Sequence, residues 1–175
     1  MNIKLIYGSD TNNTENFIDT YLFTMLEESG FEVGEPITVD KVEKSVWKDN
    51  NNFILGIPTW YDGELQSDWE NYFEEFKQID FTNKTVAIFG LGDQVGYEEW
   101  FCDGIGILAK VVLENGGKVI GYTINDNSYE LDETPISLVD DNTFYGLCID
   151  DDNQDELTED RAKLWVSQLV KEFNI

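Results

Sequence analysis

The sequence FILGI at residues 53–57 is an unbroken apolar run of strand length, and it ends at Pro58. Two similar runs lie on either side of it along the chain, at 2–8 and at 85–89. Strands that are apolar along their whole length are typical of parallel sheets, because helices cover both faces of such sheets. These three runs therefore predict strands of a buried parallel sheet.

Segments with helical spacing alternate with these strands. The expected helices, each marked by apolar residues three or four positions apart, cover 13–28, 65–76, about 105–113 and about 158–173. Thr158 is the expected cap of the last helix. A regular alternation of strands and helices predicts a doubly wound α/β fold in one domain, residues 1–175.

Two weaker strands complete the expected sheet. One covers 31–39, and the other begins at 119–124 and continues at 146–149 after a polar insertion at 125–145. Five such strands favour a parallel sheet in the order 2-1-3-4-5 with helices on both faces and an insertion that splits the last strand. Because the insertion is polar and resembles a loop, we expect that its removal leaves the core intact.

The composition excludes several classes of protein. The net charge is −25, from 36 acidic and 11 basic residues, so nucleic acid is not expected as a partner. There is no His, and the only cysteines are Cys102 and Cys148, which argues against zinc chemistry and His-based catalysis. No apolar run could cross a bilayer, and the N-terminus does not resemble a signal peptide. We expect a cytoplasmic protein, or a plastid one if a transit peptide has been removed, without membrane insertion.

Polar side chains follow the first strand, in the sequence GSDTNNT at 8–14. Ligands of doubly wound sheets bind beyond the carboxyl ends of the strands, where the strand order reverses. Hydroxyls, amides and backbone N–H groups at a helix N-terminus suit a phosphate group, and an ordinary turn with a helix cap is the alternative. No Lys or Arg is present, which argues against a loop of the Walker type.

Aromatic side chains occur in the loops after the third and fourth strands. The first of these loops contains Trp60 and Tyr61, and the second, residues 90–103, combines Gly and aromatic residues with several acids. Such rings could stack on a planar ligand, a contact worth roughly 1–3 kcal/mol, although Trp60 could equally cover the core. Together the three loops predict a planar aromatic ligand with one phosphate, and no pair of nucleophile and base is visible.

The three loops resemble those of the flavodoxin family. GSDTNNTE at 8–15 is similar to the family's phosphate loop, PTWYDGELQSDW at 58–69 to its first ring-binding loop, and GLGDQVGY at 90–97 to its second. The interruption at 125–145 resembles the insertion of the long-chain members. The resemblance covers essentially the whole chain and implies a flavodoxin-like fold with one FMN bound without a covalent bond.

The resemblance also implies a role for each loop residue. The phosphate would be held by Ser9, Asp10, Thr11, Asn12, Asn13 and Thr14. The ring would be wrapped by Thr59, Trp60, Tyr61, Asp62 and Gly63, with Trp60 on its inner face and Tyr97 on its outer face. The flavin edge and the ribityl chain would contact Leu91, Gly92, Asp93, Trp100, Phe101, Cys102 and Asp103, with Asp152 as a further contact.

The sequence departs from the family pattern at three places. Asn12 stands where the family usually has Gly, and Asn tolerates a left-handed backbone better than most residues. Trp100 stands where many long-chain members have a small polar residue. The turn at 61–63 also differs from the common forms of the ring loop.

The resemblance implies a one-electron carrier and not an enzyme. The flavin would supply the redox chemistry, and the protein would set the potential and the docking of partners. The implied partners are redox proteins with basic faces, such as ferredoxin–NADP reductase or photosystem I, and a monomer is expected. The alternatives are an FMN-dependent NAD(P)H reductase acting on quinones or similar small acceptors, and a receiver domain of the same fold.

Overall fold

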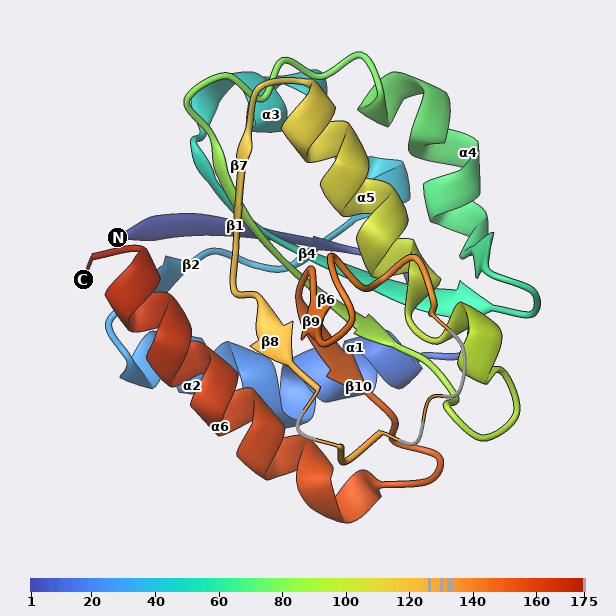
Figure 1. The fold of residues 1–175 in the computed structure, drawn as a ribbon. Helices are drawn as coiled ribbons and strands as arrows, with labels where there is room; N and C mark the ends of the chain where they lie inside the picture. The colour runs from blue at the N-terminus through green and yellow to red at the C-terminus, as the bar shows by residue number, and fades with distance from the viewer. Residues whose placement is uncertain (126, 130, 132–133, 175) are drawn as a thin grey trace.

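A parallel sheet runs through the centre of this computed structural model (Figure 1). The structure describes residues 1–125, 127–129, 131 and 134–174, so positions 126, 130 and 132–133 of the expected insertion lie outside the described residues. The interior strands pair in the order β1-β4-β6, and they are β1 (Asn2–Tyr7), β4 (Asn52–Trp60) and β6 (Thr85–Leu91).

Short strands complete both edges of the sheet. On one side β2 (Glu32–Val33) and β3 (Ile37–Thr38) pair with β1, and on the other β7 (Lys118–Ile120) and β10 (Leu147–Ile149) pair with β6. The predicted order 2-1-3-4-5 is therefore confirmed. The prediction that the last strand is split is also confirmed, because two segments far apart in the chain share one edge of β6.

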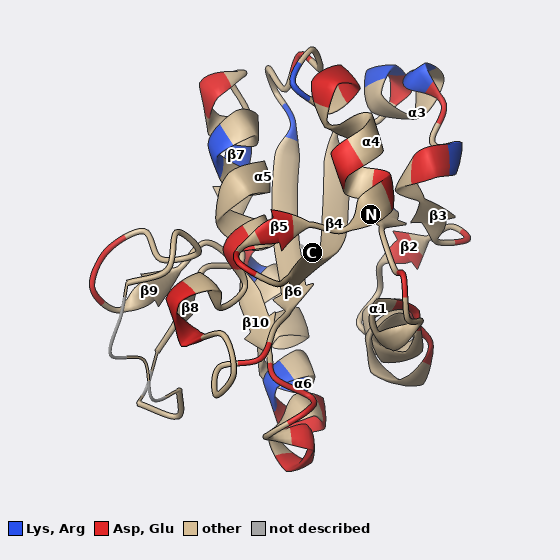
Figure 2. Ribbon diagram, turned by 90° about the vertical axis from the view of Figure 1, so that its right-hand side faces the viewer, with Lys and Arg blue, Asp and Glu red and all other residues tan. Residues whose placement is uncertain are grey.

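Helices cover both faces of the sheet, as Figure 2 shows in a view turned by 90°. One face carries α3 (Lys44–Asp49), α4 (Ser67–Phe76) and α5 (Asp103–Glu114). The other carries α6 (Asp155–Glu172) and a continuous helical run made of α1 (Asn13–Phe17), the π-helical turn η1 (Ile18–Leu22) and α2 (Phe23–Glu28). Short 3₁₀ turns are η2 (Val39–Lys41) and η3 (Glu98–Trp100). None of the described helices combines the length and the apolar character needed to cross a membrane.

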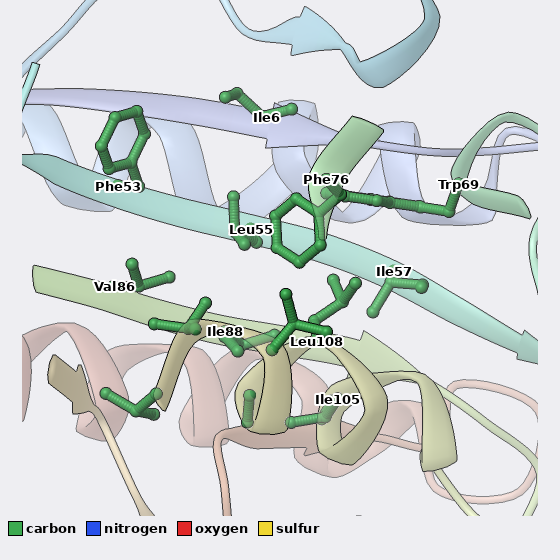
Figure 3. Close-up of a cluster of buried hydrophobic side chains, with 14 of the residues drawn as sticks. Ile6, Phe53, Leu55, Ile57, Trp69, Phe76, Val86, Ile88, Ile105 and Leu108 are labelled. Atoms are coloured by element: carbon green, nitrogen blue, oxygen red, sulfur yellow. The ribbon is translucent and has the colours of Figure 1, made fainter. Parts of the chain in front are cut away.

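The alternation of side chains along each strand supplies two cores. In β4, Phe53, Leu55 and Ile57 face α4 and α5, whereas Ile54 faces the opposite side of the sheet. Figure 3 shows the first of these clusters, with Phe76 of α4 packed against the strands. Each apolar run is thus continuous because a strand of a doubly covered sheet buries both of its faces.

Several predicted boundaries were wrong. β7 ends at Ile120 and does not continue to 124, and α4 begins at Ser67 and not at 65. β4 does not end at Pro58, since that residue lies in register with Leu91 of β6 and the strand continues to Trp60. A proline removes one N–H donor from the ladder but is compatible with an extended backbone, and the end of the strand pairs with β5 (Glu64–Leu65). The last helix starts at Asp155, and Thr158 lies inside it, where its hydroxyl donates to the carboxylate of Asp151.

The insertion packs against the core. Its strand β9 (Thr143–Phe144) pairs antiparallel with β8 (Thr123–Ile124), which directly precedes the insertion. Tyr129 and Phe144 are buried in the same cluster as α5, and the Tyr129 hydroxyl donates to the backbone carbonyl of Cys148. The expectation that removal of the insertion would leave the core intact is therefore wrong.

Candidate functional site

A cavity of about 210 Å³ lies at the carboxyl ends of the three interior strands. It is the place where the strand order reverses, because the chain turns to one side of β1 before β2 and to the other side before β4. The residues that line it come from the loops after β1, β4 and β6 and from the loop after β10. They are Ser9, Asp10, Thr11, Asn13, Thr14, Pro58, Thr59, Trp60, Tyr61, Leu91, Gly92, Asp93, Tyr97, Trp100, Phe101, Asp151 and Asp152.

The structure brings most of the predicted site residues together on this cavity. Five predicted residues do not line it, namely Asn12, Asp62, Gly63, Cys102 and Asp103. The sequence analysis missed two lining residues, Pro58 and Asp151. Each is the direct neighbour of a predicted residue at the end of a strand. Its position at the strand end was therefore the sequence signal that could have identified it as a lining residue.

The first loop leaves β1 through Gly8. A larger residue at this position would force neighbouring side chains to move. A Cβ at Gly8 would lie 1.9 Å from Oε1 of Gln66 and 2.6 Å from Cδ1 of Trp69. Asn12 adopts φ 65°, the left-handed conformation expected of it, and its carbonyl accepts from Asn16 N at 2.7 Å. The loop therefore passes close to α4 and enters the helical run beside the cavity.

Two hydroxyl groups of this loop are buried without a partner. Ser9 Oγ and Thr14 Oγ1 form no hydrogen bond within the described part of the chain, and both residues line the cavity. Buried polar atoms in proteins are nearly always paired, because each unpaired one costs about 1–3 kcal/mol. These two atoms indicate a ligand that accepts hydrogen bonds.

Asp10 of the same loop is hydrogen-bonded to residues at the start of α4. Its carboxylate accepts from Gln66 Nε2 at 2.8 Å and from the hydroxyl and backbone N–H of Ser67. Partial burial alone would raise the pKa of Asp10, but the hydrogen bonds from Ser67 and Gln66 outweigh it and lower the pKa below its usual range. Asp10 thus stays ionised and ties the loop to the start of α4.

The second loop is the connection of a hairpin. Trp60 of β4 pairs with Glu64 of β5, so that Tyr61, Asp62 and Gly63 make the turn. Tyr61 has φ 41° and Gly63 has φ 82°. A positive φ at a bulky residue is uncommon and costs of order 1–3 kcal/mol, and such strain clusters at ligand sites.

The aromatic residues of the second loop face the cavity and the solvent. Trp60 Nε1 is buried without a partner among the described residues, and Trp60 lines the cavity. Tyr61 is 60% exposed, and its ring centroid lies 5.8 Å from that of Trp60. Thr59 accepts from Gly104 N at 3.0 Å, which fixes the loop to the start of α5.

The third loop is held by one aspartate. Asp93 Oδ1 accepts from the backbone N–H groups of Val95 and Gly96 and from Asn153 Nδ2, at 2.8–2.9 Å. Although partial burial raises it, the pKa of Asp93 is lowered overall by these hydrogen bonds. Tyr97 N donates to Asp93 O at 3.0 Å, and the Tyr97 side chain is 41% exposed on the cavity wall.

The loop after β10 reaches the third loop. Asp150 is fully buried, and its carboxylate accepts from Gln94 N at 3.2 Å and from Asn153 Nδ2 at 2.9 Å. Gly92 N donates to Ile149 O at 3.0 Å. Asp151 and Asp152 are thereby carried to the edge of the cavity.

Two predicted residues lie behind the cavity wall. Cys102 is fully buried with φ 57°, and its Sγ lies 3.6 Å from the carbonyl oxygen of Gly90. Asp103 is 4% exposed, and a Cβ at Gly63 would lie 3.0 Å from its Oδ2. Burial raises the pKa of Asp103 to about 6, against the opposing effect of hydrogen bonds from the backbone of Ile136 and Ser137. Both residues support the loops from below.

The cavity is acidic and contains no cation. Four aspartates line it, and no Lys or Arg is among the lining residues. Figure 2 shows Asp and Glu in red at this end of the sheet, for example on β5. In the part of the chain that the structure describes, no group of three His, Cys, Asp or Glu side chains is arranged to hold a metal ion. A phosphate would therefore be held here by neutral donors alone.

Comparison with known proteins finds flavodoxins along the whole chain. The flavodoxin family model matches residues 5–165. A flavodoxin from Nostoc sp. is 40% identical over 173 residues, which cover 99% of this chain and 98% of that protein. A flavodoxin from Klebsiella pneumoniae is 37% identical over 99% of this chain and 95% of that protein. The crystal structure of Fusobacterium nucleatum flavodoxin bound to flavin mononucleotide has a TM-score of 0.86 at 33% identity, with 98% of both chains covered.

Proposed function

The chain belongs to the flavodoxin family, and from this premise we propose that its three loops hold one FMN at the carboxyl ends of β1, β4 and β6. It is an electron carrier that uses FMN, and it is not an enzyme. When bound, FMN accepts and releases single electrons. The protein contributes binding, orientation and the electrostatic surroundings of the ring. The insertion between β7 and β10 supports membership of the long-chain group.

The phosphate of FMN would bind in the first loop. Ser9 Oγ and Thr14 Oγ1 would donate to it, together with backbone N–H groups of residues 9–14 at the start of the helical run. Because no Lys or Arg lines the cavity, the charge of the phosphate would be stabilised by the helix N-terminus and by hydroxyl and backbone donors alone.

The ring would lie between the second and third loops. Trp60 and Tyr97 would cover its two faces, with Thr59, Tyr61, Asp62 and Gly63 around one edge. The other edge and the ribityl chain would contact Leu91, Gly92, Asp93, Trp100, Phe101 and Asp152, with Cys102 and Asp103 acting from behind the wall. The aspartates disfavour added negative charge on a ring in this poorly solvated site, which favours a strong electron donor.

The observation that carries this proposal is the coincidence of three unpaired buried donors on one cavity. Ser9 Oγ, Thr14 Oγ1 and Trp60 Nε1 are each buried without a partner in the described residues, and each residue lines the same space. A phosphate with a planar ring attached would satisfy the two hydroxyls and cover the indole.

Calorimetry on the apoprotein tests the phosphate site. Loss of one hydrogen bond to a charged group costs about 1.5–3 kcal/mol, so Ser9→Ala and Thr14→Val should each weaken FMN binding about tenfold or more. Riboflavin, which lacks the phosphate, should bind these variants as well as it binds the wild type.

A matched control separates this role from a general effect on folding. Thr38 Oγ1 is also buried without a partner among the described residues, but Thr38 belongs to β3 and does not line the cavity. Thr38→Val should leave FMN affinity unchanged. Equal losses in all three variants, or equal losses for FMN and riboflavin, would contradict the proposed phosphate site.

The partners would be redox proteins with basic faces, such as a ferredoxin–NADP reductase or photosystem I. The charge of −25, the exposed acids Asp62, Glu64 and Glu99 and the half-buried Glu98 near the cavity support docking of this kind. We propose that the protein acts as a monomer. A cytoplasmic location is also proposed, since Cys102 and Cys148 are both buried and unpaired, as in most proteins of reducing compartments.

A further inference from the structure

A second and larger cavity lies at the opposite end of the sheet. Its volume is about 420 Å³, and it opens between α3, α4 and the turn that leads into β6. The residues that matter in its lining are Lys44, Lys48, Trp47, Tyr72, Ile79 and Lys84. It lies where β4 and β6 begin, whereas the first cavity lies where these strands end. The FMN site therefore does not account for it.

The base of this second cavity contains a buried ammonium group. Lys84 is only 8% exposed, and its Nζ donates to the backbone carbonyl of Asn50 at 2.9 Å and lies 6.0 Å from the centre of the Phe53 ring. Within the described residues Lys84 forms no ion pair. The nearby carboxylate of Asp80 interacts with Lys84 only through space, and the charge of Lys84 is the smallest of the causes that act on the pKa of Asp80. A lysine can donate three hydrogen bonds, and the structure gives Lys84 one acceptor, the carbonyl of Asn50. Lys84 is therefore suited to receive an anion.

A second hydrogen-bond donor faces the same space. The Tyr72 hydroxyl accepts from Trp47 Nε1 at 2.9 Å, and no described residue accepts the proton of that hydroxyl. Burial raises the pKa of Tyr72, although the hydrogen bond from Trp47 opposes this, so the group stays protonated. The rings of Trp47 and Tyr72 and the side chain of Ile79 provide the apolar part of the lining.

The local charge is positive in a strongly acidic protein. Three lysines line the second cavity, against the two acids Glu75 and Asp80. Asp80 is engaged mainly by Thr82, because hydrogen bonds from Thr82 and, to a smaller extent, the charge of Lys84 lower its pKa. Figure 2 shows Lys residues in blue on α3, away from the red segment of β5. In a chain with a net charge of −25, this is a surface that attracts anions.

We propose that the second cavity binds a small aromatic carboxylate. The carboxylate would lie between Lys84 Nζ and the Tyr72 hydroxyl, with Lys44 and Lys48 at the opening. The aromatic body would rest on Ile79 and the ring of Tyr72. Ligand cavities of a few hundred Å³ typically combine an apolar lining with a few convergent polar groups, which is the arrangement found here.

Calorimetry with 1-naphthoate on the FMN-loaded protein tests the proposal. We expect one binding site per chain, with 1-naphthalenemethanol, the uncharged analogue, and inorganic phosphate each binding at least tenfold more weakly. Lys84→Met keeps the apolar stem and removes the charge, and it should weaken binding about tenfold, the effect of one lost charged hydrogen bond. Tyr72→Phe should weaken it severalfold.

Surface variants keep the test independent of any effect on folding. Lys44→Gln and Lys48→Gln change exposed side chains of α3 and should each weaken binding, more so at low salt. The control Lys163→Gln removes an exposed lysine of α6 that pairs with Glu159, and it should have no effect.

Nuclear magnetic resonance locates the site. The indole Nε1–H resonance of Trp47 should shift on addition of 1-naphthoate, because that group donates to the Tyr72 hydroxyl, while the resonance of Trp60 stays in place. The proposal is overturned if 1-naphthoate does not bind, if Lys84→Met binds it as tightly as the wild type, or if only the Trp60 resonance moves.

Discussion

Replacing Asp103 by Asn should stabilise the protein above pH 6. Asp103 lies at the start of α5 and is 4% exposed, and its Oδ1 is buried without a partner in the described structure. Burial raises its pKa from 3.8 to about 6, although hydrogen bonds from the backbone of Ile136 and Ser137 act in the opposite direction. An amide oxygen could accept those same hydrogen bonds, and the amide does not ionise.

The magnitude follows from the difference between the folded and unfolded pKa values. The folded protein holds this proton more tightly than the unfolded chain, so the stabilisation is complete below about pH 4 and is lost as the pH rises through about 6. The difference is equivalent to roughly 3 kcal/mol at 1.36 kcal/mol per pH unit. Allowing for solvent screening, we expect Asp103→Asn to gain about 1.5–3 kcal/mol at pH 7.5.

Urea unfolding of the apoprotein between about pH 5 and 7.5 measures this effect. The advantage of the variant should grow with pH and level off above about pH 7. Asp140→Asn is the matched control, because backbone hydrogen bonds from Asn142 and neighbouring groups lower the pKa of Asp140, and removing that carboxylate should bring no gain. A difference between Asp103→Asn and the wild type that is constant across this range would refute the reasoning.

Three further outcomes are expected. Gly8→Ala should lower the free energy of unfolding by about 1–3 kcal/mol and weaken FMN binding, because its Cβ would lie 1.9 Å from Gln66 Oε1. Gly34→Ala, whose Cβ meets nothing closer than 3.5 Å, should change neither, and equal urea midpoints for the two variants would contradict this. Tyr129→Phe should cost about 1–3 kcal/mol in thermal unfolding, since the Cys148 carbonyl loses its partner; an unchanged midpoint would mean that this hydrogen bond contributes nothing. The rate of reduction by a basic partner protein should fall as salt rises through about 0.15 M, and a stopped-flow rate independent of salt would argue against electrostatic docking.

The centre of the sheet could be predicted because its strands are unbroken apolar runs. β1, β4 and β6 bury both faces, so their sequences carry a strong signal. β2 and β3 have two residues each, too few for any periodicity, and their pairing with β1 depends on tertiary contacts. The short helix α3 was missed for the same reason, since six residues present less than two helical turns.

The cavity could be predicted because most of its lining residues cluster in three loops of the sequence. Residues that are buried behind the cavity wall and support these loops form no comparable cluster. Asp103 and Cys102 were expected to contact the ligand because they follow the third loop, but they lie buried behind the wall. In the insertion, Tyr129 and Phe144 lie in a mainly polar stretch whose apolar residues have no regular spacing, so no period reveals that they are buried. Only the folded chain places them against α5.

The split edge of the sheet has a consequence for folding kinetics. β7 can join β6 as soon as the α5 crossover forms, but β10 must first bring together the ends of residues 121–146. Closing a loop of that length costs about 3 kcal/mol of chain entropy, so β10 should dock late, after a nucleus of β1, β4 and β6. The N–H of Gly92 depends on Ile149 of β10 for its acceptor. The third loop is therefore fixed by this hydrogen bond only in the late step. In a refolding chain, the rate of FMN binding should report the rate at which β10 docks on β6.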